Sequence, residues 1–184
     1  MSDSHDSEEH GITAQNIMAR VMITAAIILV LLVLTWGFNG YIEHQRNPNR
    51  ELRSTLTGEF IEVVLLRNRY GHYHATGQIN GLEVEFLVDT GATYVAIPDS
   101  VARKLGLERG SPVPVQTANG TAQAFPTRLA SVSIGPIVLH QVRALISPGL
   151  EGAEVLLGMS VLKTLELVQR GEELTLRQIR PSTL

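Results

Sequence analysis

The chain of 184 residues contains no cysteine. This absence excludes disulfide bonds, a thiolate nucleophile and any zinc site built on cysteine, and it leaves the cellular compartment open. Three common catalytic motifs are also missing: the Gly-x-Ser-x-Gly elbow, the His-Glu-x-x-His zinc helix and the Gly-x-x-x-x-Gly-Lys phosphate loop. The sequence therefore gives no support for a serine hydrolase, a zinc peptidase or a P-loop nucleotide-binding protein built on these motifs.

Beyond residue 38 neither sign of charge is in excess. Residues 39–184 hold fourteen Lys and Arg and fourteen Asp and Glu, interspersed along the sequence. A nucleic-acid-binding surface requires clustered positive charge. We therefore expect no nucleic-acid partner.

One uncharged apolar run, from Val21 to Phe38, lies near the N-terminus. About 20 apolar helical residues cross a hydrocarbon core of roughly 30 Å, and the run reaches this length when it is extended back to Ile17. A buried core helix would have a polar face, and a cleaved signal peptide would begin with basic residues. The first sixteen residues instead carry four acidic residues and no Lys or Arg. We predict a transmembrane helix at 17–38, and hence a membrane partner.

The rest of the chain divides by composition. Residues 1–16 are acidic and Ser-rich, which is typical of a disordered tail. Residues 39–60 are polar and are expected to form a tether to a folded domain at 61–180. Arginines in the tether favour a cytoplasmic domain by the positive-inside rule, whereas an N-terminal anchor commonly leaves its domain outside. We expect a single-pass protein of the inner (cytoplasmic) membrane with its domain in the periplasm.

From Phe60 onward, short apolar or alternating runs separated by turn residues predict an all-β barrel or sandwich. Asn80-Gly81 predicts a type I′ hairpin between strands at 73–79 and 82–88. A second hairpin is expected between 113–117 and 121–125.

One short helix is expected within this β domain. Asp99 or Ser100 can cap a helix at 101–105, and Gly106 can end it. A last pair of strands is expected on either side of Gly171, at 166–169 and 174–179.

Histidines offer an alternative kind of site. His72 and His74 would share one face of a strand, with His140 as a conceivable third metal ligand. Two partly exposed strand histidines require no ligand to explain them, however. We therefore expect no metal and no other cofactor.

Only two aspartates occur beyond the apolar run, Asp89 and Asp99. Asp99 lies at the expected helix start, where a carboxylate caps amide groups. Asp89 directly follows the apolar stretch 84–88 and precedes Thr90 and Gly91. A carboxylate after a buried strand is poorly solvated, although Asp-Thr-Gly is also an acceptable turn.

The surrounding sequence, Phe-Leu-Val-Asp-Thr-Gly-Ala-Thr at 86–93, resembles the catalytic signature of aspartic proteases. Val-Leu-Leu-Gly-Met at 155–159 resembles the second signature of that family, an apolar pair followed by Gly, which packs beside the active-site loop. The resemblance covers roughly residues 73–179 and is to single-lobed, retropepsin-like proteases of the bacterial membrane-anchored type. It implies a closed acid-protease barrel with one short helix, preceded by the transmembrane helix.

The resemblance also implies a role for each residue of the first motif. Asp89 would be the catalytic carboxylate, and Thr90 would hydrogen-bond across to a partner lobe. Gly91 would allow the tight turn and present its N–H to the carboxylate. Ala92 and Thr93 would lie along the substrate, with the Thr93 hydroxyl in reach of Asp89.

The second predicted hairpin occupies the place of the flap that folds over substrate in this family, with Ala118, Asn119 and Gly120 at its tip. Peptide hydrolysis by this chemistry needs two carboxylates that share a proton. The chain supplies one Asp-Thr-Gly, so the resemblance implies a homodimer that acts on a protein or peptide.

Two other classes of function compete with this interpretation. A membrane-tethered β domain that binds a peptide without cleaving it would keep the barrel but would not require Asp89. A structural subunit of a membrane assembly would not require it either. The intact Asp-Thr-Gly-Ala-Thr string favours an aspartic-type endopeptidase, a hydrolase.

Overall fold

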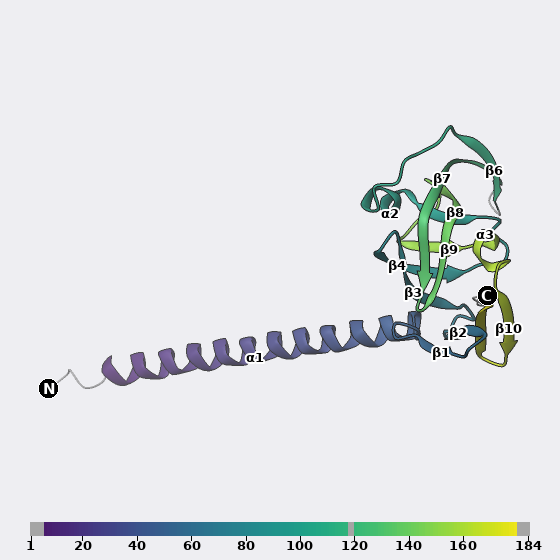
Figure 1. The fold of residues 1–184 in the computed structure, drawn as a ribbon. Coiled ribbons are helices and arrows are strands. Elements are labelled where there is room, and N and C mark those ends of the chain that lie inside the picture. Colours follow the sequence, from purple (N-terminus) through teal and green to yellow (C-terminus); the bar gives the residue numbers. More distant parts are fainter. Residues whose placement is uncertain (1–5, 118–119, 180–184) are drawn as a thin grey trace. The chain divides into compact units, whose positions relative to one another are not determined.

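The computed structural model describes residues 6–117 and 120–179 of the chain (Figure 1). They fall into two units, an N-terminal one that ends at Glu43 and a domain that begins at His44. The elements in chain order are α1 (Asp6–Arg46), β1 (Arg53–Leu56), β2 (Phe60–Leu66), β3 (His74–Ile79), β4 (Leu82–Val88), β5 (Val95–Pro98), α2 (Asp99–Lys104), β6 (Val113–Thr117), β7 (Gly120–Ile134), β8 (Ile137–Ser147), β9 (Glu154–Leu157), α3 (Met159–Leu162), β10 (Glu166–Arg170) and β11 (Glu173–Ile179).

The N-terminal unit consists of helix α1, which starts within the segment expected to be disordered. Its stretch Met18–Ile42 has 25 residues and a mean hydropathy of 2.6, so it is long and apolar enough to cross a membrane. Every side chain from 18 to 38 is exposed. The hydroxyls of Thr24 and Thr35 donate to carbonyls four residues earlier, at 2.8 and 2.7 Å, which satisfies them without water.

The domain is built around a closed barrel. Its larger sheet has the strand order β3-β4-β9-β5-β8-β7-β6, and β3 also pairs with β7. This extra pairing closes six strands into a ring and leaves β6 as an extension of β7. Closure removes the unpaired edges that an open sheet would present. The predicted all-β, closed barrel is confirmed.

Two parallel pairings run through the barrel and bring distant segments together. Strand β4 pairs with β9 in parallel, with Val88 opposite Leu157. Strand β5 pairs with β8 in parallel as well. Because the carboxyl ends of parallel neighbours meet at one edge of the sheet, the residues after Val88 and after Leu157 lie next to each other.

A second, four-stranded sheet has the order β1-β2-β11-β10. In Figure 1 it lies at the end of the domain away from α2 and β6. The hairpin of β10 and β11 turns at Gly171, which has a φ of 57°, so the last predicted strand pair is confirmed.

Both predicted hairpins of the barrel region are present. Asn80 and Gly81 have φ of 52° and 81°, as a type I′ turn requires. Strands β6 and β7 pair from Val113 with Ala124 to Thr117 with Gly120. Residues 118 and 119, at the tip of this second hairpin, lie outside the described residues.

The short helices differ from the prediction in two respects. Helix α2 begins at Asp99 and has no side-chain cap, so the predicted capping by Asp99 or Ser100 is wrong. The Asp99 carboxylate instead pairs with Arg103 and Arg109, because guanidinium groups give it a stronger, charged partner. Gly106 ends the helix with a φ of 61°, as expected. The four-residue helix α3 was not predicted.

The segment expected to be a tether, 39–60, is largely structured. It contains the end of α1 and all of β1, and between them Asn47 and Asn49 are buried. The Asn49 amide nitrogen donates to the carbonyls of Leu66 and His74, at 2.8 and 2.7 Å, and its side-chain oxygen accepts the Leu66 N–H at 2.6 Å. Asn49 thus bridges β2 and β3 where the two strands separate, which a purely compositional argument cannot detect.

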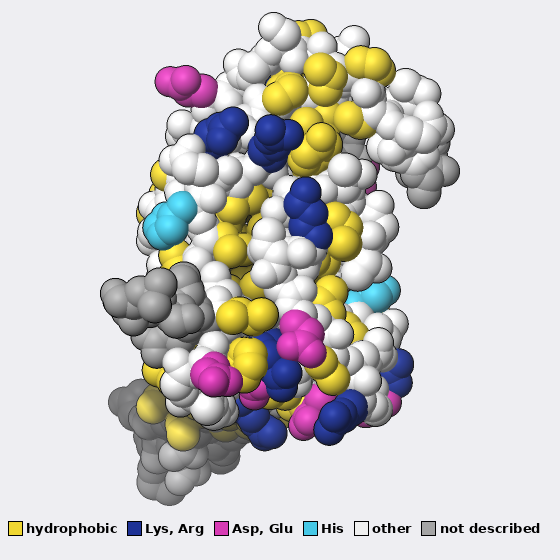
Figure 2. Space-filling view, turned by 45° about the vertical axis from the view of Figure 1, so that its right-hand side comes forward, with side chains coloured by type: hydrophobic (Ala, Val, Ile, Leu, Met, Phe, Trp, Pro, Cys, Tyr) yellow, Lys and Arg dark blue, Asp and Glu magenta, His cyan; other side chains and the backbone are white. Residues whose placement is uncertain are grey.

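Charges of both signs are mixed on the surface. Figure 2 shows hydrophobic and basic side chains interspersed on one face, with acidic and basic side chains next to each other toward its lower end. No large field of one sign covers the visible part of this face, in keeping with the balanced composition of residues 39–184.

Candidate active site

Asp89 begins a tight loop at the end of β4. Its backbone N–H donates to the carbonyl of Leu157 on β9 at 3.2 Å, and its carbonyl accepts the N–H of Ala92 at 3.3 Å. The carboxylate is partly exposed, and its Oδ1 accepts the N–H of Gly91 at 2.9 Å. The loop therefore presents a carboxylate at the surface while one backbone donor fixes its orientation.

The loop is held in place by the segment that follows β9. The N–H of Met159 donates to the carbonyl of Ala92 at 2.7 Å, and the N–H of Ser160 donates to the carbonyl of Thr93 at 2.9 Å. The Ser160 hydroxyl in turn accepts the N–H of Val95 at 3.0 Å. The two motifs singled out in the sequence are thus bonded to each other through their backbones.

Gly158 makes this close approach possible. A Cβ at this position would lie 2.2 Å from the carbonyl oxygen of Tyr94 and 2.6 Å from that of Ala92. No side chain fits into such a space without moving the backbone. The glycine of the second motif is therefore a direct steric requirement of the loop that carries Asp89.

The other candidate residues of the loop are exposed or half-buried. Thr90, Gly91 and Thr93 are exposed, and Ala92 is half-buried. Within the described chain, the hydrogen bond that the Asp89 carboxylate accepts is the one from Gly91, so the contact implied for the Thr93 hydroxyl is not formed in this single chain.

The candidate flap residues are only partly described. Gly120 is the first residue of β7 and has a φ of 106°. The hydroxyl of Thr117 donates to its carbonyl at 2.7 Å, which stabilises the described end of the hairpin. Ala118 and Asn119 fall outside the described residues.

Comparison with known proteins decides the family of this barrel. Residues 75–164 match the model of the gag-polyprotein putative aspartyl protease family. The fold matches the crystal structure of a retropepsin-like aspartic protease from Rickettsia conorii, with a TM-score of 0.58 and 28% sequence identity over 69% of this chain and 98% of that chain. The chain carries a retropepsin-like aspartic protease domain. Both signature motifs lie within the matched segment.

Two curated relatives are similar in sequence to this chain. An uncharacterised protein of a Sinorhizobium species is 42% identical over 120 residues, which are 63% of this chain and 52% of the relative. An uncharacterised protein of Rickettsia prowazekii is 33% identical over 106 residues, which are 55% of this chain and 45% of the relative. The chain therefore spans about half the length of the curated relatives it matches.

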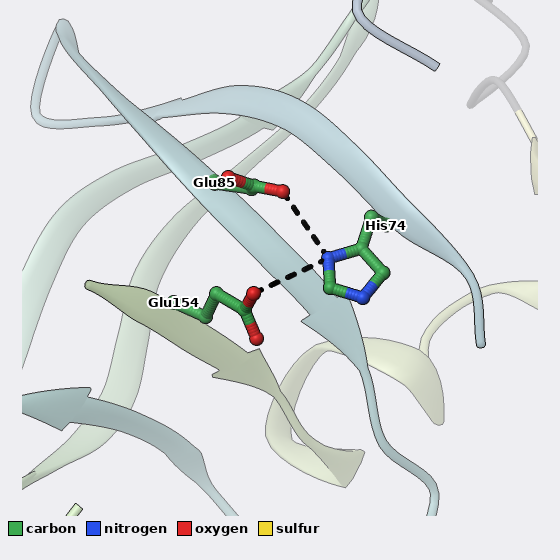
Figure 3. Close-up of side chains that lie close together, drawn as sticks. All are labelled: His74, Glu85 and Glu154. Atoms are coloured by element: carbon green, nitrogen blue, oxygen red, sulfur yellow. Dashed lines mark hydrogen bonds and ion pairs between the residues drawn. The ribbon is translucent and has the colours of Figure 1, made fainter. Parts of the chain in front are cut away.

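A second group of charged side chains lies inside the retropepsin-like domain (Figure 3). Nδ1 of His74 on β3 lies 3.2 Å from Oε1 of Glu85 on β4 and 3.8 Å from Oε1 of Glu154 on β9. The ligand atoms of the three residues lie within 4.8 Å of one another, a spacing that would also suit a metal ion. This group, found among the described residues, includes neither His72 nor His140.

The charge balance of this group favours an ion-pair network. Nε of Arg46 donates to the same Glu154 oxygen at 2.8 Å, so a guanidinium already supplies positive charge next to the carboxylates. The hydrogen bond with His74 lowers the pKa of the Glu85 carboxyl; partial burial opposes this, and the charges of Arg46, His74 and Arg50 add to the lowering. The network joins β3, β4 and β9, and the last two of these strands lead into the Asp89 loop and Gly158.

Gly158→Ala should destabilise the domain and abolish any activity that depends on Asp89. The added Cβ has to displace backbone, and overpacking of this kind costs about 1–3 kcal/mol or more. Thermal unfolding of the solubilised full-length protein measures the effect. Gly149→Ala is the matched control, because a Cβ there meets nothing within 4 Å. Equal melting temperatures for the two variants would contradict the steric argument.

Glu85→Gln should weaken the domain in a pH-dependent way. Because folding lowers the pKa of the Glu85 carboxyl, its ion pair stabilises the domain above the ordinary pKa of 4.5 and is lost as the pH falls through the lowered value. We expect a loss of roughly 0.5–1 kcal/mol at neutral pH, modest because the side chain is partly solvated. The difference from wild type should shrink as the pH is lowered to about 3.5.

Unfolding by urea at several pH values tests this expectation. Glu83→Gln serves as the control, since Glu83 lies exposed on the same strand. A difference between Glu85→Gln and wild type that stays constant from neutral to acid pH would argue against an ionised network.

Proposed function

We propose that this protein is a membrane-anchored aspartic endopeptidase in which Asp89 from each of two copies forms one active site. The observation that carries the proposal is the position of Asp89. Its carboxylate is oriented by the Gly91 N–H, at the start of a loop that the backbone N–H groups of Met159 and Ser160 hold in place in a retropepsin-like barrel. A domain that only bound peptides would have no use for a carboxylate held in this way.

In the proposed reaction one Asp89 is ionised and the other protonated. The ionised carboxylate takes a proton from a water molecule, whose oxygen attacks the scissile carbonyl carbon, and the protonated carboxyl donates its proton to the carbonyl oxygen. The diol collapses when the carboxyl that gained the water proton donates it to the amide nitrogen and the C–N bond breaks. The other carboxylate takes a proton from a diol hydroxyl, which restores the starting state of the pair. Two carboxylates at contact distance favour this shared proton, because like charges so close together cannot both ionise, as is well established for aspartic proteases.

Homodimerisation follows from the number of carboxylates. Each barrel contributes one Asp-Thr-Gly loop, and the reaction uses two. Thr90 and Gly91 are proposed to complete the catalytic loop across the two copies, which fits the exposure of both in a single chain. Ala92, Thr93 and the flap residues Ala118, Asn119 and Gly120 are proposed to contact the substrate.

The four-stranded sheet is the proposed contact between the copies. Strands β2 and β11 are the inner strands of this sheet, with β1 and β10 at its edges. A second copy therefore has to meet the face of the sheet or the β1 and β10 edges. Leu56 and Ile179, both more than 60% exposed, are apolar side chains available for such a contact.

Membrane anchoring is part of the same proposal. The apolar stretch of α1 has the length and hydropathy of a membrane span. Two copies confined to one membrane meet at a higher effective concentration, which offsets a small interface. We place the protease domain in the periplasm and the N-terminus in the cytoplasm.

Asp89→Asn should abolish peptide cleavage and leave the fold intact. The amide oxygen can still accept the Gly91 N–H, but the group can no longer exchange a proton. We expect the rate to fall by at least about a thousandfold. Asp99→Asn is the control, since Asp99 pairs with two arginines away from the loop and should keep wild-type activity. Cleavage by purified Asp89→Asn at the wild-type rate would rule out the assignment.

The same variant tests the homodimer. Mixed with wild type at three to one, Asp89→Asn should reduce activity per wild-type chain to about one quarter, because random pairing puts three quarters of the wild-type chains into inactive mixed dimers. Light scattering reports the mass of the active species. A rate that is unaffected by the variant, from a species with the mass of a monomer, would contradict the shared site.

Protease accessibility tests the topology. Protease added to spheroplasts should digest the domain, while a tag on the N-terminus stays protected. Digestion of the N-terminal tag with an intact domain would place the domain in the cytoplasm, as the arginines after the span would favour.

A further inference from the structure

A hollow with a volume of about 520 Å³ opens beside the active-site loop. Residues from three segments line it: the loop after Asp89, strand β8 and helix α3 with the residues after it. The lining residues that matter here are Thr93, Tyr94, His140, Arg143, Met159 and Lys163. The proposed reaction uses none of these side chains to move protons.

The hollow is physically continuous with the catalytic loop. Thr93 lines it and lies four residues after Asp89, so at most about 14 Å of chain separates the two. Ser160, also in the lining, donates its N–H to the Thr93 carbonyl. An extended peptide bound at Asp89 covers the same distance with about four residues.

The charged side chains of the hollow are all positive. They are Arg143 and Lys163, and the lining contains no acidic residue. In the part of the chain that the structure describes, Arg143 and Lys163 make no ion pair with a carboxylate. Both side chains therefore have their charge available for an anionic ligand.

The backbone around the hollow carries two features that cost stability. Arg143 on β8 lies directly opposite Arg128 on β7, and like charges in such a pair repel each other. Gln141, also in the lining, has a φ of 55°, which is uncommon for a residue with a side chain. Unfavourable arrangements of this kind persist where a function requires them.

We propose that this hollow is a substrate subsite for an acidic side chain, located within four residues of the scissile bond. The carboxylate of an Asp or Glu would lie between Arg143 and Lys163, with His140 as an additional hydrogen-bond donor. The aliphatic part of the side chain would pack on the apolar portion of the lining, which consists of Tyr94, Leu139, Val142 and Met159. The inference rests on the proposed protease function and adds the class of substrate.

The test compares pairs of peptides that differ only by Glu or Gln at one position, moved stepwise through the four residues on each side of the cleaved bond. We expect the Glu peptide to be cleaved with a kcat/KM roughly three- to tenfold higher at one or two adjacent positions, the range for two exposed charge pairs. The preference should reside in KM and should shrink at high salt.

The double variant Arg143→Gln, Lys163→Gln should bring this ratio to about one without lowering kcat for the Gln peptide. Lys104→Gln, which changes an exposed lysine at the end of α2 outside the hollow, should keep the wild-type ratio. Arg143→Gln alone should leave the melting temperature unchanged or raise it, because it removes the repulsion with Arg128. A fall in melting temperature would mean that Arg143 supports the fold and would count against the subsite.

The proposed subsite and the proposed protease function can be tested independently of each other. Binding of the same peptides, fluorescently labelled, to the Asp89→Asn variant reports the charge preference by anisotropy without any cleavage. Equal affinity for both peptides, no binding of either, or a ratio unchanged in the double variant would each overturn the subsite. If the wild type cleaves no peptide, the protease function is wrong, and the binding ratio alone then decides whether the hollow selects an acidic side chain.

Discussion

The contact between the Asp89 loop and the segment after β9 is the constraint on which the site depends. Two backbone hydrogen bonds, from Met159 and Ser160 to the loop, leave no room for a side chain at 158. The contact exists because β4 and β9 are parallel neighbours, which in turn requires the chain to cross the barrel between them. The conformation of the Asp89 loop is therefore a property of the whole barrel and not of the loop sequence alone.

Features set by short stretches of sequence were predictable. The hairpin at Asn80-Gly81 follows from two residues that tolerate positive φ, and the end of α2 at Gly106 follows from the same property. The proximity of Asp89 to residues 155–159 was predictable only by resemblance to aspartic proteases, because no local signal links segments about seventy residues apart. The family resemblance thus supplied the one long-range contact that defines the candidate site.

Features that depend on tertiary partners were missed. By composition Asn49 belongs to a polar tether. In the structure its side-chain amide hydrogen-bonds to the carbonyls of Leu66 on β2 and His74 on β3, and so links the two strands. Sequence alone groups His74 with His72, two residues before it, whereas its charged partners Glu85 and Glu154 come from two other strands. The sequence predicts that Asp99 caps a helix, but its carboxylate forms ion pairs with Arg103 and Arg109 instead. In each case the deciding partner is remote in sequence.

The burial of Asn47 and Asn49 has a consequence for where the domain can be separated from the rest of the chain. Both side chains are buried within the domain, and Asn49 hydrogen-bonds to the carbonyls of Leu66 and His74. A fragment that begins at β1 would leave these carbonyls without their donor, at a cost of about 1–3 kcal/mol for each buried polar group left unpaired. A stable soluble fragment of the domain therefore has to begin before Asn47, although β1 starts only at Arg53.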